Sequence, residues 1–298
     1  MIQEDMELRK LELYISEVLK KDIYKRRKIE YCQRCGCKSY IRYGSYKGIQ
    51  RYKCKECGKT FSNTTNSIWS YSKKETKLWM KFVEFMIEKK SLRFCAENLS
   101  INLVTAFYWR HKVLHALTLD DTPNMLKGII YIGKTIVKEN FKGCRNIEEI
   151  RQSTHRRRNI WIIGAKGEED SMFIKPIFKD FWDLKLFNEK VYTKIEKKSY
   201  IVSYGDRYLS LVAQKHNKKR LINVKDDNRI RYMILNLMNW FAVFRGVATK
   251  YLQRYLSFYI LFNLDRIFSC MELIYNDLLS GNRFIRTNQI RIVENYMY

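Results

Sequence analysis

Five of the eight cysteines in this chain lie between positions 32 and 57. Four of them form two C-x2-C pairs, Cys32 with Cys35 and Cys54 with Cys57, at the spacing of a four-cysteine zinc site. Clustering of this kind in an intracellular chain favours a metal over disulfides. Because thiolates would fill all four positions around the ion, the zinc would be structural, with no position left for water or substrate.

The residues around these cysteines indicate how they are positioned. Each pair is followed by a glycine, Gly36 or Gly58, which allows the tight turn that points two thiolates at one ion. The intervening stretch "SYIRYGSYKGIQRYKC" alternates like a β-hairpin, so residues 29–64 are predicted to form a zinc ribbon. So small a module depends on its metal for folding. We interpret Cys37 as a neighbour of the site, and leave open that it is an alternative ligand to Cys35.

The charge of the chain points to a polyanionic partner. There are 57 Lys and Arg residues against 31 Asp and Glu, a net charge of +26. Neutralising phosphates releases condensed counterions, so double-stranded DNA is the expected partner. The competing interpretation is a basic surface that serves only solubility. The ribbon interleaves aromatic with basic side chains, and its predicted DNA contacts are Arg42, Lys47, Arg51 and Lys53.

The N-terminal sequence argues against export and membrane insertion. No run of about 18 apolar residues occurs, so no membrane span is expected. Residues 1–28, predicted to form a helix, carry acids where a signal peptide would need a basic start. We therefore expect a cytoplasmic, nucleoid-associated protein.

Helical periodicity follows the ribbon over residues 72–120. Three helices with short turns are predicted, and "LSIN" separates the second from the third, as in a helix-turn-helix. The third helix would then enter a major groove, with predicted DNA contacts at Thr105, Trp109, Arg110, His111 and Lys112. The alternative is a helical hairpin that only packs on the next domain.

Strand patterns begin at Leu126. The stretch "LKGIIYIGKTIVKENFKG", residues 126–143, is predicted to be a hairpin of two short strands around a Gly-Lys turn. Further strands are predicted at "RNIWIIGAKG", "MFIKPIF" and "YIVSYG", and a helix at "NRIRYMILNLMNWFAVF". Strands followed by helices indicate an α/β fold for residues 125–265, before a helical extension over residues 266–298.

A family resemblance rests on two further motifs, "TAFYWRHKVLHAL" from Thr105 and "FRGVATKYLQRYLSFY" from Phe244. With the ribbon before them, they resemble bacterial insertion-sequence transposases of the Merlin-like group, over roughly residues 25 to 265. The resemblance implies a zinc ribbon, a helix-turn-helix and an RNase H-like core in that order, in a bacterial protein that dimerises through the core.

In that family, acids on the first strand, the fourth strand and a later helix hold two Mg²⁺ ions for phosphoryl transfer. Aligning Thr135 and the run from Glu139 to Gly143 with the family pattern assigns Gly133 and Lys134 to the Asp-Glu positions. Tyr204 then occupies the position of the second acid and Arg231 that of the third, with Met238 replacing a basic residue. None of these side chains holds Mg²⁺, so no catalytic magnesium is expected.

The sequence thus predicts a DNA-binding, regulatory descendant of a transposase without enzymatic activity. The alternative is an active Mg²⁺-dependent transposase with relocated ligands, for which Asp206, Asp226, Asp227 and Glu139 are the nearest acids. A decaying gene product is a third possibility, although it would show damage spread evenly over the chain. The basic run Arg156, Arg157 and Arg158 is a further candidate DNA contact, or a solvated loop.

Overall fold

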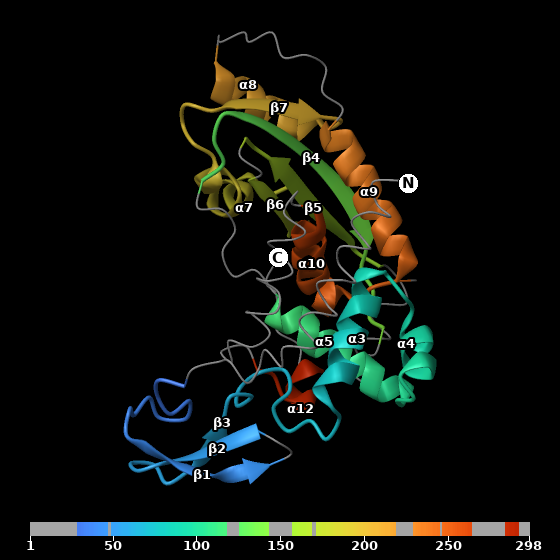
Figure 1. Cartoon of the computed structure of the whole chain (residues 1–298). Helices are drawn as coiled ribbons and strands as arrows, with labels where there is room; N and C mark the ends of the chain where they lie inside the picture. Colours follow the sequence, from blue (N-terminus) through green and yellow to red (C-terminus); the bar gives the residue numbers. More distant parts are fainter. Residues whose placement is uncertain are drawn as a thin grey trace. The chain divides into compact units, whose positions relative to one another are not determined.

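The structure is a computed structural model (Figure 1). It describes residues 29–46, 49–117, 125–142, 157–168, 171–218, 229–244, 246–263 and 284–291. The predicted helix over residues 1–28 lies outside these ranges. The chain divides into two compact units, the first comprising Met1–Leu117 and Phe268–Ile292, the second Thr118–Ile267 and Val293–Tyr298. In the described part of the chain, no helix combines the length and apolar character needed to cross a bilayer.

The first unit contains the predicted hairpin as part of a three-stranded antiparallel sheet. Its strands are β1 (Tyr40–Tyr46), β2 (Ile49–Cys54) and β3 (Thr60–Ser62), in that order. One face of this sheet packs three aromatic rings together, with Tyr52 stacked on Phe61 and Tyr40 edge-on to both. Among the described residues of the module, the fully buried apolar group is Phe61 with Cys32 and Cys54, and the two tyrosines pack against it.

Three helices follow in the same unit, as the periodicity predicts: α3 (Thr76–Ile87), α4 (Leu92–Asn98) and α5 (Leu103–Ala116). The side chains of Ser91 and Asn102 cap the last two by accepting backbone N–H bonds. Trp79 of α3 stacks on Trp109 of α5, with ring centroids 3.9 Å apart. The short helix α12 (Thr287–Ile290) packs on α5.

The second unit is built on a four-stranded sheet. The strands are β4 (Ile129–Lys138), β5 (Asn159–Lys166), β6 (Met172–Lys179) and β7 (Tyr200–Tyr204), in the order β6-β5-β4-β7. The first three are antiparallel, and β7 pairs with β4 in parallel.

The predicted hairpin over residues 126–143 is wrong. Residues 129–138 form one continuous strand, β4, and Gly133 lies at its centre rather than in a turn. The reason is that β4 is flanked by a partner on each side: Gly133 is opposite Gly164 of β5 and opposite Tyr204 of β7. A glycine whose strand is paired with another strand on each side stays extended, despite the preference of glycine for turns.

The helices of this unit cover both faces of the sheet. Alternate residues of β4, Ile130 and Ile132, belong to an apolar cluster with Phe187 and Leu209. These two come from α7 (Leu184–Lys190) and α8 (Arg207–Asn217), which therefore cover one face. The other face meets α9 (Arg229–Val243) and α10 (Leu252–Asn263), and α9 runs beside β4 (Figure 1).

The "GVATKYL" run, residues 246–252, leads into α10 through the short 3₁₀ helix Thr249–Tyr251. Thr249 fixes the segment that leaves β4, because its hydroxyl accepts the backbone N–H of Asn140 at 2.8 Å and its own N–H reaches the Asn140 carbonyl at 2.9 Å. Gly246 has φ +95, and a Cβ there would lie 3.1 Å from the Asn140 side chain. Close contact with Asn140 and a positive φ therefore explain the glycine at position 246, and hydrogen bonding to Asn140 explains the threonine at position 249.

Candidate metal centre and nucleic-acid interface

The two cysteine pairs are held by matching backbone turns. In the first, Gly36 donates its N–H to the Cys32 carbonyl at 2.8 Å, and in the second, Gly58 donates to the Cys54 carbonyl at 3.2 Å. Both glycines have the left-handed backbone that the sequence predicts, with φ +80 and +66. The backbone N–H of Arg34 also points at the Cys32 sulfur, at 3.4 Å.

These turns bring the four predicted sulfur atoms together. Cys32, Cys35, Cys54 and Cys57 have all their Sγ atoms within 4.8 Å of one another. The closest approaches are 3.6 Å between Cys35 and Cys54 and 3.8 Å between Cys32 and Cys57. A tetrahedron with zinc–sulfur bonds of about 2.3 Å has edges of about 3.8 Å, so the cluster fits a tetrahedral ion of that size.

Proton sharing among the thiols also fits a cation at this position. Backbone N–H groups of Cys57 and Glu56 point at the Cys54 sulfur and, despite desolvation, lower the pKa of that thiol to about 6. For Cys35, the N–H of Cys37 favours the thiolate, but desolvation and bonds from the other three thiols outweigh it and raise the pKa to about 12. A dication would replace the protons that the cluster shares.

Cys37 is not one of the four clustered sulfurs. Its Sγ instead accepts the backbone N–H of Ser39 at 3.2 Å and lies 3.6 Å from the Ser39 carbonyl. It is therefore a neighbour of the metal position. Of the three cysteines outside the ribbon, Cys95 is fully buried, and Cys144 and Cys270 lie outside the described residues.

The outer face of the ribbon sheet carries part of the predicted DNA-contacting set. Arg51 and Lys53 both lie over the ring of Tyr43, at 5.9 and 5.4 Å from its centroid. The register sets Lys53 beside Ile41 and Thr60, on the same face. Arg42 is exposed but pairs with Tyr52, which belongs to the opposite, packed face. Lys47 lies outside the described residues.

The predicted contacts of the third helix need correction. Trp109, Arg110 and His111 are buried within the first unit, with exposed fractions of 5%, 5% and 2%. Trp109 stacks on Trp79, and Arg110 donates to the Lys90 carbonyl at 2.8 Å. These side chains hold the helices together and are not surface contacts.

Two predicted contacts on this helix keep part of their surface. Thr105 and Lys112 are partly exposed, although burial lowers the pKa of Lys112, and its ammonium lies 5.6 Å from the ring centroid of Phe284. The exposed residues at the start of the helix are apolar, Leu103 and Val104. The polarity of a residue type was therefore a poor guide to which face of α5 is outside.

In the second unit, β4 and β7 bring two of the predicted degenerate positions together. Gly133 and Tyr204 are directly paired in the parallel register, so both lie on the same face of the sheet. Neither offers a carboxylate. The pair therefore consists of a glycine, which has no side chain, and a tyrosine, at two positions where the family resemblance implies acids.

The chain has a relative in a mobile element. It is 33% identical, over 115 residues, to an uncharacterized protein in transposable element ISH50 of Halobacterium salinarum. The match covers 38% of this chain and 38% of that protein. No protein-family model matches the chain. The similarity supports a relation to transposase proteins of insertion sequences, and a halophilic archaeal relative weakens the expectation of a bacterial source.

The third of the predicted degenerate positions lies on α9. Arg231 is exposed and precedes Met238 by two helical turns, so the two share one side of the helix. The sulfur of Met238 lies 3.2 Å from the Thr135 hydroxyl of β4. Thr135 is two residues from Gly133 along the strand and points to the same face. The side of α9 that bears Arg231 is therefore the side that meets β4.

The alignment assigns Lys134 to the Glu position next to Gly133. The Lys134 side chain, however, does not lie on the same face of the sheet as Gly133. As the next residue of the strand it points to the opposite face, where its ammonium forms an ion pair with Asp206 and lies 3.9 Å from the ring centroid of Trp161. The Asp206 side chain is only 6% exposed, and it also caps α8 by accepting the Leu209 N–H at 3.0 Å.

The remaining acids near the sheet are also engaged. Glu139, just past β4, is 5% exposed and pairs with Lys179 at 2.5 Å. Asp180 accepts the N–H of Asn159 at 2.9 Å and lies 3.7 Å from Arg158. Asp226 and Asp227 fall outside the described residues.

The basic run ahead of β5 is only partly described. Arg157 and Arg158 are exposed, and Arg156 lies outside the described residues. Sequence reasoning missed Arg34, which lines the same cavity as the predicted contact Arg51. Arg34 lies between Cys32 and Cys35 in the sequence, and its spacing to Arg51 matches no recognisable motif.

Proposed function

We propose that this chain is a DNA-binding protein derived from an insertion-sequence transposase of the Merlin-like zinc-ribbon group, with an RNase H-like core that no longer holds catalytic Mg²⁺. The observation that carries the proposal is the pairing of Gly133 with Tyr204 on one face of the sheet. Hard cations need oxygen ligands, above all carboxylates, and neither residue supplies one.

The strand order supports the RNase H-like part of the proposal. In the family that the sequence resembles, the acids that hold two metal ions come from the first strand, the fourth strand and a later helix. Here the first and fourth strands of the sheet, β4 and β7, are parallel neighbours, and α9 packs against β4. This arrangement is compatible with the scaffold of such a centre, and in the proposal its ligand side chains have been replaced.

The ion pair of Asp206 weighs against relocated metal ligands. Asp206 points to the face covered by α8, holds Lys134 and caps that helix, so recruiting it would break two interactions on the wrong side of the sheet. We expect no Mg²⁺- or Mn²⁺-dependent cleavage or strand transfer on DNA that carries candidate element ends. Metal-dependent turnover that disappears in Asp206→Ala would favour the active-transposase alternative.

DNA binding is supported by the net charge of +26 and by the basic and aromatic outer face of the ribbon. Binding to a blunt duplex should weaken with salt, with a log–log slope of about −3 to −5 if three to five phosphates are neutralised. Lys53→Gln should reduce the magnitude of that slope by about one. Glu56→Gln is the matched control, since removing an exposed negative charge should not weaken binding. A salt-insensitive affinity would refute DNA binding through phosphates.

A further inference from the structure

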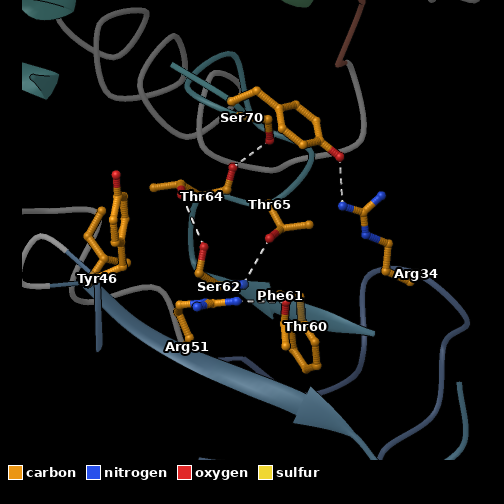
Figure 2. A pocket seen from close by; sticks show the side chains of 11 residues that line it. Arg34, Tyr46, Arg51, Thr60, Phe61, Ser62, Thr64, Thr65 and Ser70 are labelled. Atoms are coloured by element: carbon orange, nitrogen blue, oxygen red, sulfur yellow. Dashed lines mark hydrogen bonds between the residues drawn. The ribbon is translucent and has the colours of Figure 1, made fainter. Parts of the chain in front are cut away.

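The first unit contains a cavity of about 260 Å³ on the outer face of the ribbon sheet. Residues from separate segments line it: Arg34 from the first cysteine turn, Arg51 from β2, and Tyr71 from the loop that follows β3. Figure 2 shows Arg34 and Tyr46 on opposite sides, with the hydroxyl residues between them. Ligand pockets start at about 300 Å³, so the cavity suits one small polar unit rather than a duplex groove.

Two guanidinium groups make this cavity positive. Arg34 donates one N–H to the Tyr71 hydroxyl at 2.8 Å, and Arg51 donates one to the Thr60 hydroxyl at 2.9 Å. Each guanidinium has five N–H donors, and neither forms an ion pair with an acid among the described residues. The hydrogen bond from Arg34, together with the charges of Arg34 and Arg286, lowers the pKa of Tyr71.

Hydroxyl groups fill the wall between the two arginines. The hydroxyls of Ser62 and Thr64 lie 3.1 Å apart, so their mutual bond uses one proton and leaves the other for a ligand. The loop is held in shape by the Ser62 N–H, which donates to the Thr65 hydroxyl at 2.8 Å, and by Ser70, which donates to the Thr64 carbonyl at 2.8 Å. Neutral donors beside guanidinium forks suit phosphate oxygens.

Aromatic side chains border the same cavity. Tyr46 is 63% exposed at its rim, and Tyr71 is 71% exposed. Tyr71 has φ +62, a backbone conformation unusual for a residue with a side chain. In this conformation its hydroxyl accepts a hydrogen bond from Arg34. An exposed ring next to a phosphate site offers a stacking surface for a base.

We propose that this cavity binds one unpaired nucleotide of a DNA strand, with its phosphate between Arg34 and Arg51 and its base on the ring of Tyr46. The proposal rests on the DNA-binding function above and adds a preference for strand ends or flipped nucleotides. A base pair inside a duplex cannot serve, because both of its faces are covered by its neighbours in the stack. A free phosphate would use the guanidinium groups but not the aromatic wall.

The test compares three probes on the zinc-loaded full chain by fluorescence anisotropy: a blunt duplex, the same duplex with a single-stranded tail, and the tail alone. Stacking of one base corresponds to about fivefold to about 150-fold in affinity, so the tailed duplex should bind tighter than the blunt one by a factor in that range. Tyr46→Ala and Arg34→Gln should bring this ratio close to one. Lys53→Gln, on the outer face but outside the cavity, should weaken both duplexes by the same factor.

The outcomes separate this inference from the proposed function. Equal binding of blunt and tailed duplexes overturns the nucleotide site and leaves duplex binding intact. Binding of the single strand without the duplex overturns the duplex-binding function but supports the site, provided that Tyr46→Ala abolishes it. Failure to bind any probe overturns both. Zinc content of one ion per chain in each variant excludes an unfolded ribbon, and Tyr46→Phe should restore the tail preference.

Discussion

The cysteine cluster of the ribbon brings together four metal-ligand side chains, whereas the Gly133–Tyr204 pair of the core sheet is the place where we propose that metal ligands have been lost. They differ in what surrounds them. The ribbon's buried apolar group is little more than Phe61, two cysteines and the tyrosines against them, whereas the core sheet has a large apolar cluster of its own. A module without a core cannot lose its ligands and stay folded. A sheet with a core can lose its acids and keep its shape.

The largest effect should therefore come from the ribbon. In Cys54→Ser, loss of one thiolate should abolish ordering of the ribbon, because zinc binding contributes about 10–16 kcal/mol to such modules. Metal content and hydrogen exchange of β2 and β3 would measure this, and a chelator should reproduce it. Cys37→Ser is the control, since the Cys37 sulfur bonds to Ser39 and lies outside the four-sulfur cluster, so this variant should keep its metal. If β2 and β3 remained protected from hydrogen exchange without metal, the ribbon would not depend on its ligands for folding, and its contrast with the core sheet would be lost.

The second effect concerns the ion pair that lies behind the degenerate site. Asp206→Ala removes the partner of a largely buried lysine and the cap of α8, and should destabilise the core by about 3–5 kcal/mol. Urea unfolding of the core would measure it. Asp183→Ala is the matched control, because Asp183 caps α7 through the Leu186 N–H but is exposed, and should lose about 1 kcal/mol. Equal losses in the two variants would mean that Asp206 is only a cap.

Much of this architecture could be predicted from the sequence, because it is encoded locally. The cysteine spacing gave the four ligands, and alternation and helical periodicity gave the ribbon hairpin and the three helices after it. The strand patterns around Ile162 and Ile201 also match β5 and β7. Each of these depends on neighbours a few residues away in the chain.

What could not be predicted depends on partners far away in the chain. Gly133 suggested a turn, yet the pairing of β4 with β5 and β7 keeps it extended. Trp109 and Arg110 suggested DNA contacts, yet Trp79 and the Lys90 carbonyl draw them into the interior. The face on which Lys134 lies likewise follows from the strand's length, which the hairpin prediction missed.

A third, smaller effect would test whether the core still has the geometry of a metal centre. Gly133→Asp with Tyr204→Asp puts two acids at paired positions on the face toward α9. We expect Mn²⁺ to stabilise this variant by about 1.4 kcal/mol at ten times its Kd, since an ion that binds only the folded state shifts stability by mass action. Thermal unfolding with and without Mn²⁺ would measure it. The double Asn variant has the same size without the charges and should not respond, and a response equal to that of the double Asp variant would exclude a carboxylate site.

The smallest effect concerns Lys112, which the sequence assigns to DNA and the structure partly buries against Phe284. Burial lowers its pKa below 10.5, so between the folded and unfolded pKa values the unfolded chain binds more protons, and stability rises with pH in that alkaline window. Lys112→Met removes this rise. At neutral pH its gain from avoided desolvation is offset by the lost cation–π contact, so its unfolding free energy should change by less than about 1 kcal/mol. The difference in Tm between the two proteins, measured from pH 8 to 10.5, should shift steadily in favour of the parent chain. A constant difference across that range would mean that Lys112 is as well solvated in the folded state as in the unfolded chain, and its assignment to a DNA-facing surface would regain support.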